Sequence, residues 1–351
     1  MRTDAPVRIV ICEDSATYAH ALTRFLERDD DLRVVGVCAD GEALLSSIEG
    51  LAPDLITMDI ELPGLDGLQV TQQVMRRQPC PILVISSHTR RGSDRAAAAL
   101  ASGALEAIPK AEIRLDQSQG PSAVALRRRI KRLAVARLAH RTTTPSRPSP
   151  PTAQLVAHHS TAAVVVGAST GGPRALRSVI EGLTARFPVP VLVVQHMAPG
   201  FIEGLARWLD DLAPLPVRMA SEGALAEPGV WFAPDGAHLL LDARLRMHLD
   251  ADRVVGRHRP AADVLLDSAA EALGSHATGV VLTGMGRDGA AGTEAIVRAG
   301  GLVIAEDAST AAVNGMPAAA VARGAQLALP VGEIAGLLHR LRPRPDLGPR
   351  G

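Results

Sequence analysis

Short apolar runs alternate with amphipathic stretches over the first 140 residues. The runs are rich in Val, Ile and Leu, which is typical of buried strands, and the stretch after each has its apolar residues at helical spacing. Strands are expected at 7–12, 32–37, 54–58, 81–86 and 105–108, and helices at about 15–28, 41–50, 68–77, 93–101 and 123–139. Because right-handed crossovers of this kind give a parallel sheet with helices on both faces, the pattern predicts a doubly wound α/β domain.

A second stretch of the same kind begins at Ala162, after a break in the pattern. Residues 141–160, RTTTPSRPSPPTAQLVAHHS, are rich in Pro, Ser and Thr and show no periodicity, which indicates a flexible or polyproline-like linker. Further strands are expected at 162–166, 189–195, 229–233, 279–282 and near 302–305. We therefore predict two doubly wound α/β domains, at residues 6–125 (with a last helix that runs to about 139) and 161–345.

The turn GASTGGP, residues 167–173, follows the first apolar run of the second domain. We expect a buried strand, a sharp glycine turn and a helix that starts near Pro173, because proline is tolerated at the first helical position. Ser169 then lies at the carboxyl edge of the sheet, where backbone N–H groups and the helix dipole point at its hydroxyl. The G-x-S-x-G spacing matches a nucleophile elbow. A helix-capping serine in a glycine turn is the alternative that these residues alone leave open.

Two more polar residues follow apolar strands of this domain: His196 comes after VPVLVVQ, and Asp288 lies in TGMGRDGAAG. Singly they suggest a structural histidine and a loop cap. With Ser169 they favour a nucleophilic triad, in which histidine takes the serine proton and the acid fixes the histidine tautomer. The backbone N–H of Thr170 or of Met285 is expected to form an oxyanion hole. GASTGG lacks both the P-loop lysine and the second glycine of the dinucleotide fingerprint.

In the first domain, carboxylates gather at strand ends. Glu13 and Asp14 follow the first strand and Asp59 follows the third. Parallel strand ends share one edge, so these three groups are expected to converge and to bind a hard cation such as Mg²⁺. Ser86 and Lys110 follow the fourth and fifth strands, and a carboxylate beside Mg²⁺ and lysine can accept a phosphoryl group. Solvated loop carboxylates are the alternative for each acid taken alone.

Composition narrows the function classes. The chain has 37 basic and 37 acidic residues and only four Phe, two Trp and one Tyr, so neither a broad nucleic-acid surface nor base stacking is expected. The three cysteines lie in apolar runs, which suits free thiols in a reducing compartment. We recognise no signal peptide and no run of ~18 apolar residues, and therefore expect a cytoplasmic protein without membrane insertion.

Residues 6–125 resemble a response-regulator receiver domain, which has a flavodoxin-like fold. The resemblance rests on MDIELPGLDGL (58–68), VISS (84–87) and Gly103-Ala104. It implies that Asp59 is phosphorylated by a histidine kinase, that Ser86 and Lys110 are the switch hydroxyl and lysine, and that Mg²⁺ is the cofactor. It implies as metal ligands Glu13, Asp14, Asp59 and the backbone carbonyl of Glu61.

This domain departs from the family pattern at three positions. Glu13 replaces the more usual Asp. Ala107 stands where an aromatic switch residue is common, and Ala111 follows Lys110 where Pro is usual. Phosphorylation is still expected, whereas these departures leave open how the receiver would switch.

Most of residues 162–330 resemble the catalytic domain of the chemotaxis protein-glutamate methylesterases, which also deamidate glutamine. The matching stretches are VGASTGGPRAL, QHMAPGF, APDGAHLLL, HRPAADVLLDSAA, LTGMGRDGAAG and AEDASTAAVNGMP. The resemblance implies a Rossmann-like esterase domain with Ser169, His196 and Asp288 as its triad and no cofactor for the ester hydrolysis. It also implies methyl-accepting chemotaxis receptors as substrates.

Two other functions remain open at this point. A small-molecule serine hydrolase would use the same nucleophile but is expected to carry its acid between serine and histidine, and would ignore receptor substrates. A phosphorylation-dependent binding module without catalysis is disfavoured because all three candidate triad residues are present.

Overall fold

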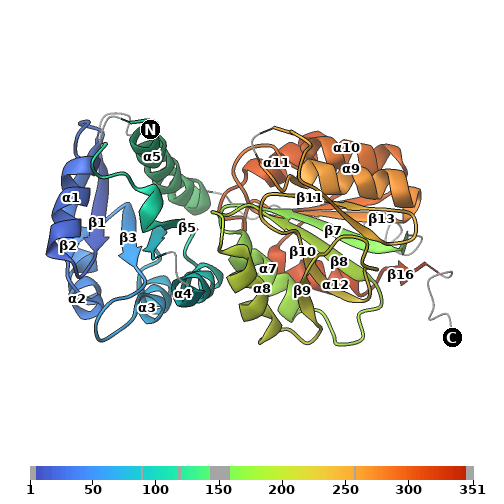
Figure 1. The fold of residues 1–351 in the computed structure, drawn as a ribbon, viewed down its shortest axis with the longest axis horizontal. Coiled ribbons are helices and arrows are strands. Elements are labelled where there is room, and N and C mark those ends of the chain that lie inside the picture. The colour runs from blue at the N-terminus through green and yellow to red at the C-terminus, as the bar shows by residue number, and fades with distance from the viewer. Residues whose placement is uncertain (1–4, 88–89, 118–119, 143–158, 257, 345–351) are drawn as a thin grey trace. The chain divides into compact units, whose positions relative to one another are not determined.

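The computed structural model describes residues 5–87, 90–117, 120–142, 159–256 and 258–344. Its contacts divide the chain into two compact units, Met1–Thr142 and Thr143–Gly351, which run from blue to green and from green to red in Figure 1. Residues 141–142 of the predicted linker belong to the last helix of the first unit, and Ser160 begins a strand of the second. Linker residues 143–158 lie outside the described residues.

The first unit is a five-stranded parallel sheet in the order β2-β1-β3-β4-β5, the doubly wound flavodoxin-like arrangement that the sequence predicts. Its strands are β1 (Val7–Cys12), β2 (Leu32–Cys38), β3 (Leu55–Asp59), β4 (Ile82–Ser86) and β5 (Glu106–Pro109). Its helices are α1 (Ala16–Leu26), α2 (Gly41–Leu51), α3 (Gly67–Arg77), α4 (Arg90–Ala101), the 3₁₀ turn η1 (Lys110–Glu112) and α5 (Pro121–Thr142).

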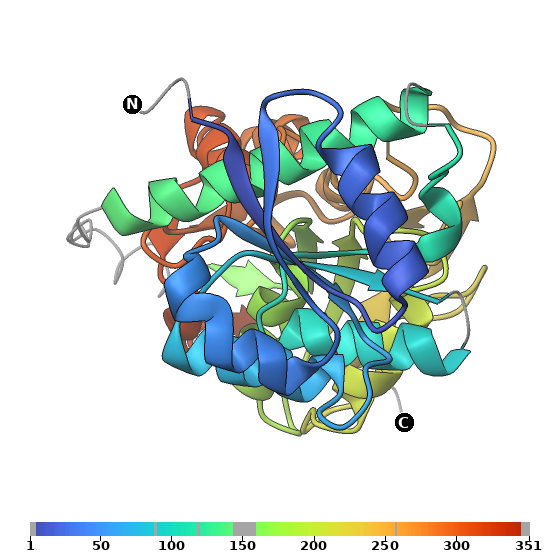
Figure 2. The same cartoon turned by 90° about the vertical axis from the view of Figure 1, so that its left-hand side faces the viewer.

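Helices cover both faces of this sheet. Figure 2 shows α1 and α5 on one face, and α2, α3 and α4 on the other. Ile9 and Ile11 of β1 are fully buried against Leu22 of α1 and Ile130 of α5. The apolar spacing of the helices that marked them in the sequence is therefore their packing face, and the strand ends with their polar residues are left at one edge.

The second unit is a seven-stranded parallel sheet in the order β15-β14-β13-β7-β8-β10-β9, which confirms a second doubly wound domain. Its strands are β7 (Ala163–Ala168), β8 (Pro190–Gln195), β9 (Val217–Met219), β10 (Gly229–Phe232), β13 (Ala277–Val281), β14 (Leu302–Glu306) and β15 (Leu327–Leu329). Its helices are α7 (Gly172–Glu181), α8 (Ile202–Asp210), α9 (Ala262–Leu273), the 3₁₀ turn η2 (Gly274–His276), α10 (Ala290–Arg298), α11 (Gly315–Ala322) and α12 (Val331–Leu338).

Several strands of this unit are too short for the sequence pattern to reveal. They include β9 and β15 at the edges of the large sheet. They also include the hairpin of β11 (His238–Leu241) with β12 (Met247–Asp250) and the pair of β6 (Ser160–Thr161) with β16 (Arg342–Pro343). Two or three residues, as in β6, β9, β15 and β16, give neither a continuous apolar run nor a clear alternation, so only tertiary pairing defines these strands.

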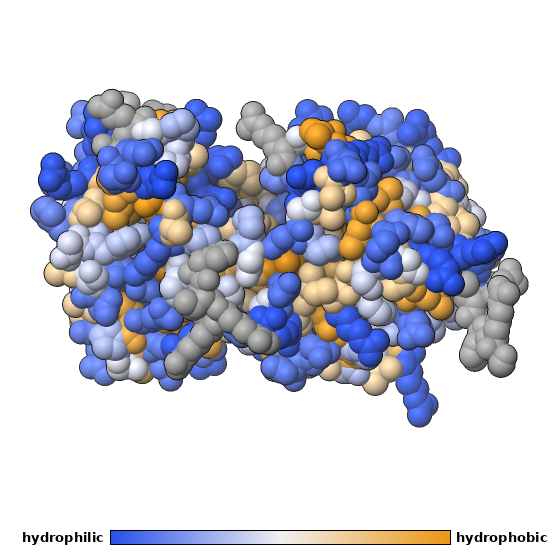
Figure 3. Space-filling view, viewed as in Figure 1, coloured by the Kyte–Doolittle hydropathy of each residue, from blue (hydrophilic) through white to orange (hydrophobic). Residues whose placement is uncertain are grey.

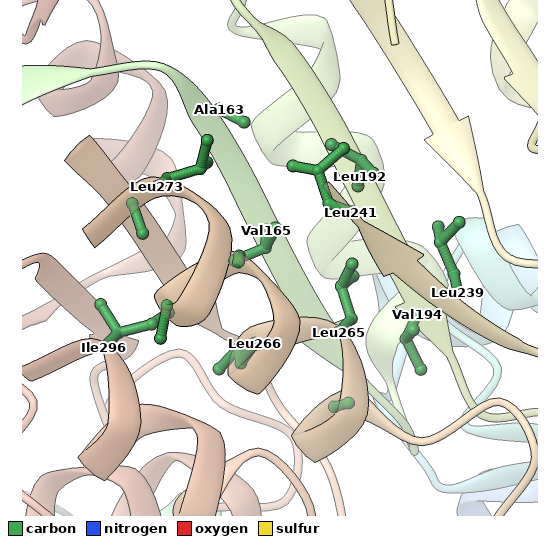
Figure 4. Packing of buried hydrophobic residues seen from close by; sticks show 14 of the residues in the cluster. Ala163, Val165, Leu192, Val194, Leu239, Leu241, Leu265, Leu266, Leu273 and Ile296 are labelled. Atoms are coloured by element: carbon green, nitrogen blue, oxygen red, sulfur yellow. The ribbon is translucent and has the colours of Figure 1, made fainter. Parts of the chain in front are cut away.

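The core of the second unit lies between the sheet and α9. Figure 4 shows Leu265 and Leu266 of α9 close to Val165 of β7, with Val194 of β8 and Leu239 of the hairpin beside them. All five are fully buried. This packing fixes the beginning of α9 next to the carboxyl ends of β7, β8 and β13.

In Figure 3, hydrophilic side chains cover most of the visible face, and hydrophobic ones form smaller areas among them. Within the described ranges, no helix has both the length and the apolar character needed to cross a membrane. Cys12, Cys38 and Cys80 are buried free thiols, as expected from their apolar surroundings in the sequence.

Candidate active site

Ser169 lies in the turn between β7 and α7. β7 ends at Ala168, and α7 begins at Gly172 with Pro173 in its first turn. Gly171 between them has a φ of 75°, a left-handed conformation that a residue with a Cβ rarely adopts. The turn therefore leaves Ser169 at the carboxyl edge of the sheet, half-buried, at the entrance to a helix N-terminus, as the sequence predicts.

His196 follows directly on the neighbouring strand β8. Ala168 pairs with Gln195 across the two strands, and the His196 N–H donates to the Ala168 carbonyl over 2.9 Å. The buried Gln195 side chain donates from Nε2 to the carbonyl oxygens of Ser169 (2.9 Å) and His196 (2.7 Å). One amide side chain thus fixes the backbones of both residues relative to each other.

Asp288, in the loop after β13, faces the His196 ring. His196 Nε2 and Asp288 Oδ2 are 2.8 Å apart. The carboxylate also accepts hydrogen bonds from the N–H groups of Ala262 (2.7 Å) and Asp263 (2.9 Å) at the start of α9. Burial raises the pKa of Asp288, but His196 and these N–H groups outweigh it and lower the pKa to about 2. Asp288 is therefore ionised at neutral pH, and its orientation is set by His196 after β8 and by the first N–H groups of α9.

The structure does not show the hydrogen bonds of a complete triad. His196 Nε2 is close to Asp288 but is not aligned well enough to form a hydrogen bond with it, and His196 Nδ1 has no hydrogen-bond partner among the described residues. Ser169 and His196 are therefore neighbours without a hydrogen bond between their side chains. Catalytic hydrogen bonds in free enzymes are often long or poorly aligned and tighten only when substrate binds, so this geometry is compatible with a triad.

The loop that carries Met285 lies against the serine. A Cβ added to Gly284 would lie only 2.8 Å from Ser169 Cβ, so no larger residue fits there without a shift. Among the described residues, none accepts a hydrogen bond from the Met285 N–H. Thr170 is buried, and its carbonyl accepts a hydrogen bond from Thr283 Oγ1 over 3.0 Å. Met285 therefore presents an available donor next to the nucleophile candidate.

His258 stacks on His196, and sequence reasoning did not single it out. The two ring centroids are 4.0 Å apart and the ring planes differ by 9°. His258 is exposed, whereas the His196 side chain retains only 7% of its accessible surface. The His258 ring therefore covers one face of the candidate base.

Asp263, the second residue of α9, is another neighbour that the sequence pattern did not reveal. Its Oδ1 accepts a hydrogen bond from the Gly292 N–H over 2.9 Å. Burial raises the pKa of Asp263, and the nearby charge of Asp288 raises it further. Two carboxyl groups with opposite pKa shifts thus lie side by side behind His196.

In the first unit, the predicted acidic cluster is present. Ligand oxygens of Glu13, Asp14 and Asp59 all lie within 4.8 Å of one another. Lys110 Nζ is 2.8 Å from Glu13 Oε2 and 2.7 Å from Asp59 Oδ2. Burial raises the pKa of Glu13. For Lys110, the hydrogen bonds with both carboxylates outweigh burial and raise its pKa. A set of carboxylate oxygens in one place has the donor chemistry that Mg²⁺ prefers.

The other predicted receiver residues surround this cluster. Ser86 is the last residue of β4 and is fully buried, and the Glu61 N–H donates to Asp59 Oδ1 over 3.0 Å. Ala107 is buried in β5, so that strand supplies no aromatic side chain at this position. The ring of Tyr18 lies 4.7 Å from Lys110 Nζ.

Comparison with known proteins identifies both units. Residues 164–338 match the CheB methylesterase family, and residues 9–117 match the response regulator receiver domain. A protein-glutamate methylesterase/protein-glutamine glutaminase of Symbiobacterium thermophilum is 39% identical over 354 residues, which cover 97% of this chain and 98% of the relative. The chain belongs to the protein-glutamate methylesterase/protein-glutamine glutaminase family. Both resemblances expected from the sequence are confirmed.

Further relatives extend this match. One from Pseudomonas aeruginosa with the same family name is 37% identical over 350 residues, with 98% of this chain and 99% of the relative covered. The crystal structure of the Thermotoga maritima CheB methylesterase catalytic domain is 43% identical, with a TM-score of 0.50, and covers 51% of this chain and 98% of that one. The chain is therefore an enzyme that joins a receiver domain to a methylesterase domain.

Within this methylesterase, His258 and Asp263 both belong to HRPAADVLLDSAA, one of the stretches on which the family resemblance rests. That match was the only signal in the sequence that pointed to them. Neither follows one of the strands predicted from the sequence, and only the packing of α9 onto the sheet brings them to the carboxyl edge.

Proposed function

We propose that this enzyme hydrolyses glutamyl methyl esters on the cytoplasmic helices of chemoreceptors, and deamidates glutamine there, through an acyl-enzyme on Ser169. The observation that carries the proposal is the His196–Asp288 pair, 2.8 Å apart, beside the Ser169 turn. The names of the relatives describe protein-glutamate methylesterases and protein-glutamine glutaminases, which supports this substrate class.

In the first half of the reaction, Ser169 Oγ attacks the ester carbonyl carbon while His196 accepts the hydroxyl proton. The carbonyl electron pair moves onto oxygen. When it returns, the bond from carbon to the methoxy oxygen breaks, and methanol leaves with the proton from His196. With a glutamine side chain, ammonia leaves in the same way. Water then attacks the acyl carbon, gives a proton to His196 and frees Ser169, so that glutamate is the product.

Asp288 and the backbone have supporting roles in this mechanism. Asp288 stays ionised, holds the His196 ring and stabilises the imidazolium that forms when the serine proton is taken. The Met285 N–H, and that of Thr170, are our candidates for donors to the oxyanion of the tetrahedral intermediate. No cofactor is assigned to this reaction.

For the receiver domain we propose phosphorylation of Asp59 by a histidine kinase. Glu13, Asp14, Asp59 and the backbone carbonyl of Glu61 would hold Mg²⁺, which offsets negative charge on the phosphoryl oxygens. Lys110, already paired with Asp59, and Ser86 would contact the phosphoryl group once it is attached. With a histidine kinase as phosphodonor and receptors as substrates, we expect the enzyme to act in the cytoplasm. We propose no nucleic-acid partner and no membrane insertion.

The test is peptide mass spectrometry of methylated receptor fragments after incubation with enzyme. The wild type should convert methyl-ester peptides to the free acid and glutamine peptides to glutamate at the same positions. Ser169→Ala should convert neither, whereas Ser178→Ala, a half-buried serine within helix α7 and outside the turn, should match the wild type. Conversion by folded Ser169→Ala would remove Ser169 as nucleophile. Unchanged receptor peptides with hydrolysis of small esters would instead favour a small-molecule hydrolase.

A further inference from the structure

A buried glutamate lies one layer behind the candidate nucleophile. Glu306 is the last residue of β14, next to β13 in the sheet, and only 2% of it is exposed. Its Oε2 accepts a hydrogen bond from the Thr283 N–H over 2.8 Å, and its Oε1 accepts one from Thr310 Oγ1 over 3.0 Å. The carboxyl group therefore joins the end of β14 to the loop after β13.

Thr283 in turn contacts the serine turn directly. Its carbonyl accepts the Ser169 N–H over 3.0 Å. Its Oγ1 donates to the Thr170 carbonyl over 3.0 Å and accepts the Val313 N–H over 2.9 Å. The carbonyl and the hydroxyl of Thr283 are thus both bonded to the turn that carries the candidate nucleophile, and its N–H is bonded to Glu306.

Gly284 and Met285, which follow Thr283, also lie beside the serine turn. The Gly284 N–H donates to the Val313 carbonyl over 3.0 Å, and Gly284 lies against Ser169 as described above. Met285, with its available N–H, follows. A shift of the Thr283 backbone would therefore move the candidate oxyanion donor and the serine relative to each other.

We propose that Glu306 is a positioning residue of the esterase site, which holds residues 283–285 against Ser169 through the Thr283 N–H. The inference rests on the proposed role of Ser169. Glu306 touches no reacting atom. It acts through Thr283, and a charged acceptor makes that hydrogen bond stronger than a neutral one does.

The surroundings of Glu306 make this support sensitive to pH. Burial raises its pKa to about 7, although the Thr283 N–H, the Thr310 hydroxyl and the charge of Arg174 on α7 oppose the shift; the charge of Asp307 adds to it. The neutral acid can still be accommodated, because Thr310 Oγ1, which accepts the Val331 N–H over 3.0 Å, has a second lone pair for the acid proton. Protonation of Glu306 then weakens its hydrogen bond with the Thr283 N–H without leaving a buried polar group unpaired.

As pH rises, the esterase rate should increase while the folding stability decreases. The carboxylate form holds Thr283 more tightly, so the rate should rise with pH through about 7. Because the folded pKa is raised above the unfolded value, native Glu306 binds its proton more tightly, and folding stability is lost as pH rises from about 4 to above 7.

Glu306→Gln is the matching variant, since its amide can accept from Thr283 and donate to Thr310 without charge. At pH 8, its kcat for methanol release from methylated receptor membranes should fall about tenfold with KM unchanged, the order of loss when one charge-assisted hydrogen bond becomes neutral. At pH 5.5 the variant and the wild type should converge. In urea unfolding, Glu306→Gln should be more stable than the wild type at pH 8 but not at pH 5. Glu333→Gln, on the exposed side of α12, is the control and should change neither quantity.

Amide hydrogen exchange tests the same role without relying on catalysis. The amides of Thr283 and Gly284, both hydrogen-bonded in the wild type, should exchange faster in Glu306→Gln than in the wild type at pH 8. Unchanged protection there, or a kcat within twofold of the wild type across the pH range, overturns the positioning role. A wild type that releases no methanol would refute the proposed function instead, and the exchange data would still decide whether Glu306 holds this segment.

Discussion

At the scale of single residues, His196 is constrained from three directions. Its N–H is bonded to Ala168 of the neighbouring strand, its Nε2 faces Asp288, and one ring face is covered by His258. A ring held in this way has few orientations left, so little conformational freedom is lost when it forms a hydrogen bond to a bound substrate or to Ser169.

The stacked ring leads to a prediction. An aromatic pair contributes roughly 0.5–1.5 kcal/mol beyond its buried area, so His258→Ala should lower kcat by about 2- to 10-fold through a less restricted His196. His258→Phe keeps a stacking ring and should retain most of the rate. Steady-state methanol release with both variants checks this. Equal loss in both would show that the histidine nitrogens, rather than the stacking, matter.

At the scale of elements, the site depends on how α9 meets the loop after β13. Asp288 accepts the N–H groups of Ala262 and Asp263, where the helix would otherwise leave its first donors without partners. The residue that faces His196, the candidate base, therefore also caps a helix. The sequence alone suggests a loop cap for Asp288, and we propose a catalytic role for it. One carboxylate can fill both roles.

This double role predicts a pH-dependent stability. Because the folded pKa of Asp288 is depressed to about 2, its contribution of up to about 2 kcal/mol is present above pH 4 and is lost as pH falls toward 2. Asp288→Asn should lower the urea midpoint of the second unit at pH 7, and the difference from the wild type should narrow below pH 4. Trp208 and Trp231, the two tryptophans, both lie in this unit, so their fluorescence reports its unfolding.

The control for this prediction is Asp267→Asn, later on the same helix, whose carboxylate accepts no hydrogen bond from the described backbone N–H groups. It should leave the pH dependence of unfolding unchanged. An equal loss of stability at pH 7 and at pH 3 in Asp288→Asn would mean that the carboxylate charge does not contribute to the helix cap.

The elements also show what the sequence could and could not predict. Long parallel strands such as β7 and β8 have continuous apolar runs, so the strands and the polar residues after them, Ser169 and His196, were predicted from the pattern. His258 and Glu306 were not, because their roles depend on partners far along the chain: His258 reaches His196, and Glu306 reaches Thr283. No local period encodes such contacts.

At the scale of the whole molecule, the enzyme consists of two units that can be considered separately, 1–142 and 143–351. The Thermotoga maritima relative of the second unit was crystallised as a catalytic domain alone, which supports the use of the corresponding fragment here. The regulatory question is whether the unphosphorylated receiver inhibits the esterase or phosphorylation activates it.

We expect inhibition by the receiver. A receiver that obstructs a bulky helical substrate until Asp59 is phosphorylated would give a coupling of ~1–3 kcal/mol, or roughly 5–150-fold activation. The fragment 152–351 should then release methanol faster than the unphosphorylated full-length enzyme. If a folded fragment is no faster, the receiver is instead an activator or a tether to its partners.

The most direct measurement of the whole account is the rate of methanol release from methylated receptor membranes by the full-length enzyme with Mg²⁺, with and without a small-molecule phosphodonor. The account predicts that the phosphodonor raises the wild-type rate within the range given above, leaves Asp59→Asn at its basal rate, and gives no detectable release with Ser169→Ala, since a triad serine supplies roughly 10⁶-fold of rate. Release by folded Ser169→Ala at the wild-type rate, or equal stimulation of Asp59→Asn, would contradict it.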